Sequence, residues 1–209
     1  MRIVGLARYL AAAAALVAPA VMALADASGP DSAPAAPSLA GQLLVATPDM
    51  GDPRFERTVI LMVRHSDEGA LGIVINRPVE EHSIAELLEA IGQSAEGVQG
   101  KVRVFAGGPV EPRIGFVLHT TDYARAETLP VDNRVAVTST PEILRDIGGG
   151  KGPKKALVAF GYAGWSAGQL ERELAHRDWA TAADDLDLVF DEDRDTVWKK
   201  AWERRTLNL

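Results

Sequence analysis

The sequence predicts one folded domain that combines short β-strands with a few helices. About 170 residues follow an N-terminal leader and linker, which is a comfortable size for a single domain with its own core. Most apolar residues come in short runs bounded by Gly, Pro or Asp, as in strands. Residues 156–173 (ALVAFGYAGWSAGQLERE) read as a strand, a turn and a helix in succession.

The first third of this domain is predicted to be mostly β-strand. Residues 42–46 form a first apolar run, and the loop at 47–53 follows with Pro, Gly and Asp as turn formers. Two further runs, 59–63 and 72–75, are separated by His-Ser-Asp-Glu-Gly at 65–69, which predicts a hairpin. Pro78 is expected to end the second run.

The middle of the chain alternates between helices and strands. Ser83 and Glu86 form an S-x-x-E capping box, which predicts a helix over 83–91. Strands are expected at 102–105, 115–118 and 135–137, the first two separated by a turn at Gly107, Gly108 and Pro109. Pro141 is suited to the first turn of a helix that would run to residue 147 and end at three glycines.

The strand–turn–helix stretch is the best specified part of the sequence. Residues 156–160 are expected to be a buried strand, and Gly161 and Gly164 would allow the tight turn after it. Ser166 is predicted to cap the next helix, in a capping box with Gln169. A strand at 186–190 and a closing helix at 193–205 complete the prediction.

Residues 1–25 resemble an export signal. A positive start with Arg2 and Arg8 precedes an almost wholly apolar run, and Ala-Leu-Ala at 23–25 fits a cleavage site. We therefore predict an exported or periplasmic protein that is cut after Ala25, with a disordered Ala/Pro/Ser-rich linker at 26–38. Two alternatives stay open: an uncleaved leader would be a membrane anchor, and a downstream start would leave a cytosolic protein.

The charge balance argues against a nucleic-acid partner. Lys and Arg number 22 against 29 Asp and Glu, and an acidic body repels phosphate backbones. The short basic stretch at 151–155 and the basic residues of the closing helix are the available patches. The chain has no cysteine, which excludes disulfides, thiolate nucleophiles and cysteine-ligated zinc.

Several motifs in order give the chain a family resemblance over nearly all of residues 39–202. They are GQLLVATPDM at 41–50, GALGIVINRP at 69–78, FAGGPV at 105–110, GFVLH at 115–119, GYAGW at 161–165 and GQLE at 168–171. With these, the domain at 39–209 resembles the AlgH/YqgE family of bacterial proteins. The resemblance implies an α+β fold whose curved, mixed β-sheet closes into a pseudo-barrel flanked by helices. The family is named partly for a proposed regulator, so the resemblance also implies a regulatory role. The family has no agreed biochemical activity. Family members generally lack an export leader, and many continue further at the C-terminus.

One stretch suggests a serine hydrolase. Gly-Trp-Ser-Ala-Gly at 164–168 fits the G-x-S-x-G pattern of a nucleophile elbow, which makes Ser166 the candidate catalytic residue. His176 is the only histidine that follows, and ten residues of helix at about 1.5 Å each would place it about 15 Å away. Ser166 is therefore interpreted as a helix cap, and the hydrolase is kept as an alternative.

Metal and cofactor motifs are missing from the sequence. His65, His82, His119 and His176 show no H-x-H or H-E-x-x-H spacing. Gly-Lys-Gly at 150–152 lacks the upstream glycine and the Ser or Thr of a phosphate-binding loop. The sequence predicts no metal and no cofactor.

The candidate binding residues come from loops and strand ends. Asp49 and Asp52 offer two carboxylates, although Asp in a Pro/Gly turn often bonds its own backbone. Asn76 and Arg77 end a predicted strand, where binding groups are often displayed. Four further candidates lie at the two glycine-rich corners: Gly107, Gly108, Trp165 and Gln169.

These observations favour a binding or regulatory module without catalytic activity. Its partner would be a protein or a small-molecule ligand, and the membrane would be contacted only through an uncleaved leader. The alternatives are a serine hydrolase that uses Ser166 and a cytosolic transcriptional regulator.

Overall fold

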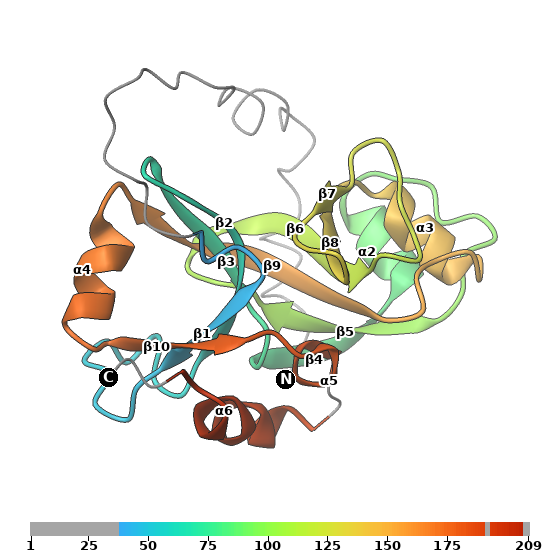
Figure 1. Cartoon of the computed structure of the whole chain (residues 1–209). Helices are drawn as coiled ribbons and strands as arrows, with labels where there is room; N and C mark the ends of the chain where they lie inside the picture. Colours follow the sequence, from blue (N-terminus) through green and yellow to red (C-terminus); the bar gives the residue numbers. More distant parts are fainter. Residues whose placement is uncertain (1–37, 191–192, 207–209) are drawn as a thin grey trace, which may run out of the picture.

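A single curled sheet forms the centre of the molecule. The computed structural model describes residues 38–190 and 193–206 (Figure 1). In them, ten strands form one sheet in the order β10-β1-β2-β3-β9-β6-β8-β7, with β4 and β5 attached beside β9. All pairs are antiparallel except β5 with β9, so the predicted α+β fold with a curved, mixed sheet is confirmed. The predicted leader at 1–25 and all of the predicted linker except Ser38 lie outside the described residues.

The elements have the following bounds. The strands are β1 Gln42–Ala46, β2 Val59–Ser66, β3 Gly69–Val74, β4 Pro78–Ser83, β5 Lys101–Ala106, β6 Val110–Thr120, β7 Leu129–Pro130, β8 Val135–Thr138, β9 Ala156–Ser166 and β10 Trp179–Ala183. The helices are α2 Ile84–Ala90, α3 Glu142–Gly148, α4 Gln169–Ala175, α5 Leu186–Phe190 and α6 Arg194–Glu203. None of these helices is long and apolar enough to cross a bilayer.

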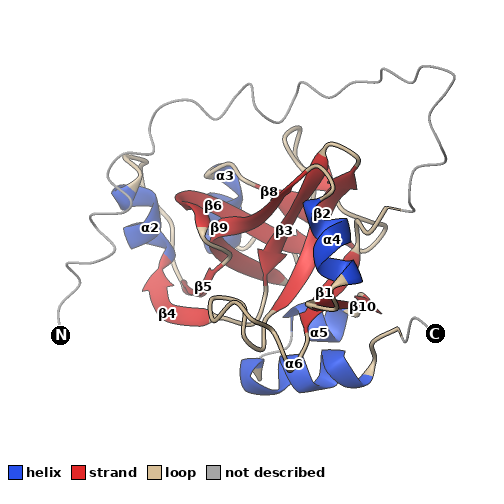
Figure 2. Ribbon diagram, turned by 90° about the vertical axis from the view of Figure 1, so that its left-hand side faces the viewer, coloured by secondary structure: helices blue, strands red, loops and turns tan. Residues whose placement is uncertain are grey.

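Three apolar clusters hold the helices against the sheet. The concave face of the sheet encloses the largest cluster, which α5 and α6 close with Leu188, Val189, Val197 and Ala201 (Figure 2). A second cluster lies on the opposite face under α4 and the 47–55 loop, and includes Trp165. The third cluster packs α2 and α3 against the far end of β9.

Strand β9 is longer than the sequence predicts. It continues for 11 residues through both glycines where a turn was expected, and it pairs with β3, β5 and β6. Gly161 has φ +76°, and a Cβ there would lie 2.4 Å from the carbonyl oxygen of Gly108. The glycines therefore permit close approach between strands, and they do not turn the chain.

The other predictions of secondary structure are confirmed in some places and wrong in others. The hairpin of β2 and β3 and the capping box of Ser83 with Glu86 are confirmed. The predicted strand at 186–190 is wrong, since these residues form helix α5. A five-residue apolar run cannot be assigned by periodicity alone. Strands β4, β7 and β10 were not predicted, and Pro78 begins β4 where it was expected only to end the strand before it.

Candidate functional site

A cavity of about 440 Å³ opens between α4, the C-terminal end of β9 and the 47–55 loop. The apolar part of its wall includes Met50, Phe55 and two tryptophans. Four charged side chains also line it: Asp52, Arg54, Glu173 and Asp178. Strand β10 contributes Trp179, and Val110 comes from the start of β6. The cavity thus gathers residues from three separate stretches of the chain, 50–55, 109–110 and 163–179.

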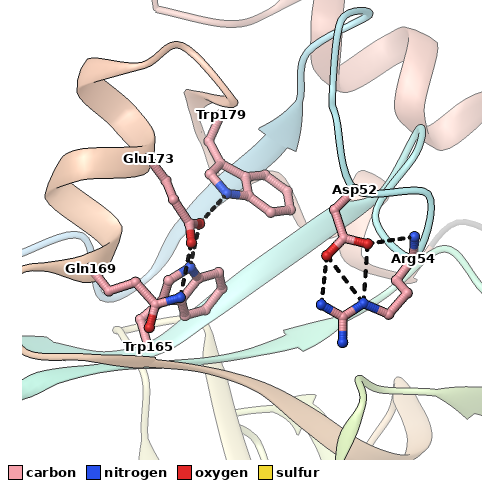
Figure 3. Close-up of polar contacts among 6 residues, drawn as sticks. All are labelled: Asp52, Arg54, Trp165, Gln169, Glu173 and Trp179. Carbon is pink, nitrogen blue, oxygen red and sulfur yellow. Dashed lines mark hydrogen bonds and ion pairs between the residues drawn. The ribbon is translucent and has the colours of Figure 1, made fainter.

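Glu173 organises one wall of this cavity (Figure 3). Its Oε2 accepts hydrogen bonds from the indole Nε1–H of Trp165 at 2.7 Å and of Trp179 at 2.8 Å. Its Oε1 accepts from Nε2–H of Gln169 at 2.9 Å. Three N–H donors thus hold one carboxylate, and the bonds to the charged oxygens are stronger than neutral ones.

Local structure explains how these residues meet. Trp165 lies on the outer face of β9, and Gln169 and Glu173 are one helical turn apart on α4, which places them on the same helix face. The two indole rings meet edge to face with centroids 6.2 Å apart. Both tryptophans are buried, with 7% and 4% of their surface exposed, so their N–H groups need an acceptor inside the protein.

The opposite wall carries the ion pair of Asp52 and Arg54 (Figure 3). The guanidinium contacts both carboxylate oxygens of Asp52, and the Arg54 amide donates to Oδ1 at 2.9 Å. These hydrogen bonds from Arg54 hold the pKa of the Asp52 carboxyl below its usual range. The next residue, Phe55, packs edge to face against Trp179 with centroids 5.5 Å apart and so fixes the loop to the cluster.

Ser166 does not cap α4 as predicted. The N-cap is Gly168 in the left-handed conformation, and Ser166 is the last residue of β9. Half of the expected box is present, because the Ser166 amide donates to Oε1 of Gln169 at 3.1 Å. The serine hydroxyl donates to the same oxygen at 3.2 Å instead of accepting from the Gln169 amide.

The geometry assembles no serine–histidine pair. His176 follows the last turn of α4 and is exposed. Within residues 38–190 and 193–206, no histidine is hydrogen-bonded to Ser166. In the same residues, no group of three His, Asp or Glu side chains is arranged to hold a metal ion.

Four predicted site residues lie outside the lining of this cavity and make contacts within the fold. Asn76 Oδ1 accepts from the Val59 amide at 2.9 Å, and its Nδ2 donates to the Arg57 carbonyl at 2.8 Å. Arg77 donates to the Glu56 carbonyl at 2.9 Å, so both side chains clamp the loop in which Arg57 has φ +49°. Gly107 and Gly108 pack against the β9 backbone, where a Cβ on either would lie 2.3 Å or less from a backbone atom.

The comparisons with known proteins agree with this architecture. The family model described as AlgH-like matches residues 43–209. The chain belongs to the AlgH-like family. A UPF0301 protein from Jannaschia sp. is 48% identical over 165 residues, which cover 78% of this chain and 86% of the relative. A UPF0301 protein from Rhodospirillum rubrum is 50% identical over 153 residues, covering 73% of this chain and 80% of the relative.

Two solved structures share the fold of this AlgH-like chain. The solution structure of the AlgH protein from Pseudomonas aeruginosa superposes with a TM-score of 0.70 at 36% identity, covering 83% of this chain and 91% of that one. The crystal structure of protein DIP2367 from Corynebacterium diphtheriae gives a TM-score of 0.64 at 21% identity, covering 83% of this chain and 90% of that one. The second match shows the fold alone.

The folded AlgH-like domain therefore brings together only some of the predicted residues. Asp52, Trp165 and Gln169 line the cavity, and Asp49 lies in the same loop but outside the lining. The sequence analysis missed Glu173, Trp179, Phe55 and Arg54. Glu173 had a usable signal, because it lies four residues after Gln169 and so shares its helix face. Trp179 is placed by the pairing of β10 with β1, which no local pattern indicates.

A second cavity adjoins the first in this AlgH-like fold. It measures about 730 Å³ and lies beside the β2–β3 hairpin. His65 stands at its edge, where Nδ1 accepts from the Leu39 amide and Nε2–H donates to Glu171 at 2.8 Å. The hydrogen bond from His65 lowers the pKa of Glu171. Three residues line both cavities: Val110, Gly164 and Trp165.

Proposed function

We propose that this AlgH-like chain is an exported binding module without catalytic activity, and that its ligand site is the cavity beside Glu173. The observation that carries the proposal is the Glu173 carboxylate, which holds two indoles and an amide in the cavity wall. Groups that satisfy one another in this way give a cavity a fixed shape. A serine hydrolase centre would instead need a base in reach of its nucleophile.

The charge of the cavity favours a ligand with a positive group. Three carboxylates line it, from Asp52, Glu173 and Asp178, against the single guanidinium of Arg54. Arg54 is already paired with Asp52. The apolar side chains of Met50 and Phe55 would accommodate the hydrocarbon part of such a ligand.

A fragment screen followed by two-dimensional NMR tests this site. Amine-bearing aromatic and aliphatic fragments should shift the indole N–H signals of Trp165 and Trp179, which are separate from the backbone amides. Asp52→Asn should weaken binding of the amines, whereas Asp49→Asn should not, because Asp49 lies in the same loop but outside the lining. A screen in which no fragment moves either indole signal would reject the site.

The absence of catalysis is tested separately. The protein should not react with a fluorophosphonate probe of activated serines, because the Ser166 hydroxyl donates to an amide oxygen. Covalent labelling that disappears in Ser166→Ala would overturn the non-catalytic proposal in favour of the hydrolase.

Export rests on the predicted leader at 1–25 and has its own test. Mass spectrometry of the protein from fractionated cells should find an N-terminus at Asp26 outside the cytosol. A soluble cytosolic chain that retains Met1 would refute export and would reopen the transcriptional regulator, whose hallmark would be salt-sensitive duplex binding.

A further inference from the structure

We propose that the C-terminal end of β9 binds an extended peptide as an added β-strand, with neighbouring peptide side chains entering the two cavities. The peptide would place a basic residue next to an apolar one. This inference rests on the proposed binding function and specifies its partner.

The first step is an incomplete pairing of β9. In the sheet, β9 lies between β3 and β6. The pairing with β6 ends at Val110 opposite Tyr162, whereas β3 continues along β9 to Gly69 opposite Ser166. Within the described part of the chain, residues 163–166 of β9 therefore have a strand neighbour on one side only.

The second step is the direction of the backbone groups along this edge. A Cβ on Gly69 would lie 2.3 Å from the Trp165 carbonyl oxygen, so that carbonyl faces β3. Backbone groups of successive strand residues face opposite edges. The N–H and C=O of Gly164 and the N–H of Ser166 therefore face away from β3. Oε1 of Gln169 accepts the Ser166 N–H on this side at 3.1 Å.

The third step is the position of the cavities on opposite faces of the sheet. Ala163 and Trp165 belong to the cluster on the outer face, where the smaller cavity opens. Tyr162 and Leu71, the partner of Gly164, pack against the core of the concave face, where the larger cavity opens. Because side chains alternate between faces of a strand, two successive residues of an added strand would enter one cavity each.

The chemistry of the two cavities differs and sets the peptide sequence. The smaller cavity carries the three carboxylates and suits Lys or Arg. The larger cavity is lined by Val63, Leu71, Val131 and Tyr162, and also by Arg64 and Glu68, one charge of each sign. It therefore lacks the excess of carboxylates found in the smaller cavity, and its apolar side chains suit an aliphatic or aromatic residue. Gly164 lies between the two cavities and is exposed, which leaves the backbone accessible to a partner.

Peptide selection with isotope-labelled protein tests the proposal. Random linear peptides displayed on phage should yield sequences in which Lys or Arg adjoins a large apolar residue. A synthetic copy should shift the Gly164 amide together with residues that line both cavities. Methylating the peptide nitrogens one at a time should weaken binding about tenfold at alternate positions and little between them, because only alternate N–H groups pair with β9.

Each of the other outcomes would contradict the addition of a peptide strand to β9. Shifts confined to the smaller cavity, or equal tolerance of methylation at every position, would overturn strand addition while leaving the proposed binding site in place. Failure to enrich any sequence above a display control would overturn it too, and the fragment screen would then show independently whether the cavity binds ligands. A Gly164 shift that depends on protein concentration alone would identify a second copy as the occupant and would reject the peptide.

Discussion

The two halves of β9 show how one strand serves both as scaffold and as site. Residues 156–160 pair with β6, residues 158–160 pair with β5 as well, and the side chains of Leu157, Val158 and Ala159 are at most 3% exposed. Residues 163–166 are paired with β3 alone, and Gly164 and Ser166 are exposed. The candidate site begins where the second partner strand ends. Pairing on both sides holds the strand in place, and its one-sided continuation leaves backbone and cavities accessible.

The junction between the halves is the point where β6 leaves β9. Six residues of β6, from Val110 to Gly115, span only the stretch from Tyr162 to Phe160 on β9. The bulge contains Glu111, whose φ is +47°, and it lies against Gly161. Such a bulge ends regular pairing and redirects a strand. The comparison therefore predicts that substitutions at the junction lower the stability of the protein more than substitutions at residues 163–166.

The largest effect is expected at the junction itself. Gly161→Ala places a Cβ 2.4 Å from the Gly108 carbonyl oxygen in a residue with φ +76°. The left-handed conformation and the backbone clash together should lower the free energy of unfolding by about 3 kcal/mol or more. Urea denaturation of both proteins measures the loss. A cost below about 1 kcal/mol would mean that the junction tolerates movement and that the two halves are not distinct.

The next effect concerns the carboxylate beside the open half. Glu173→Ala removes the acceptor of two buried indole N–H groups and should destabilise the protein by about 2–4 kcal/mol. Glu173→Gln is the matched control, because it keeps an oxygen for the indoles and loses only the bond from Gln169, at a cost of about 1 kcal/mol. Denaturation curves followed by tryptophan fluorescence compare the two variants. Equal costs would show that the indoles find other acceptors.

How far the fold can be predicted from sequence depends on where its determinants lie. The helix that begins after Ser83 is predicted because the capping box is contained within four residues. Strand β10 is missed because Trp-Ala-Thr-Ala-Ala has weak strand propensity and is fixed by pairing with β1. Glycines indicate both turns and close approach of strands, so Gly161 alone could not show that β9 continues past it.

The residues of the candidate site were likewise predicted only where the sequence signal is local. Trp165 and Gln169 are predicted because they lie at a recognisable corner of the chain. Asp52 was proposed with Asp49 as a carboxylate pair, but its partner is Arg54. Trp179 enters the cavity only through the antiparallel pairing of β1 with β10, a contact between residues more than a hundred positions apart. Sequence patterns carry the local half of the site, and tertiary pairing supplies the rest.

A smaller effect on stability is expected from His119 of β6, which pairs with Ala156 in the first half of β9. Burial lowers the pKa of its imidazole, outweighing the Thr120 carbonyl and the Asp122 charge, which raise it. Nδ1–H donates to that carbonyl, and Nε2 accepts from the Thr138 hydroxyl. Below the ordinary imidazole pKa near 6.5, His119 takes up a proton in the unfolded chain but not in the folded protein. The stability of the fold therefore falls as the pH drops from about 6.5 to the lowered pKa.

Replacing His119 should flatten that part of the pH profile. His119→Phe removes the titrating group, so the loss of stability on acidification below about pH 6.5 should be smaller than in the parent protein. Denaturant titrations at several pH values give the two slopes, and the comparison between proteins cancels the other titrating groups. Parallel slopes would mean that the folded protein protonates this imidazole freely.

The smallest effect is expected at Gly164 and is the sharpest test of the comparison. A Cβ at Gly164 would approach only side chains, 3.0 Å from the edge of the Tyr162 ring, and Gly164 lacks the positive φ of Gly161. The contact with the ring opposes the gain from a less flexible unfolded chain, so Gly164→Ala should change stability by no more than about 0.5 kcal/mol. Two glycines three residues apart in one strand would then differ by about 2.5 kcal/mol or more in their response to the same methyl group. A second chain segment covers the backbone at Gly161 and not at Gly164, so equal costs would contradict an open edge at Gly164.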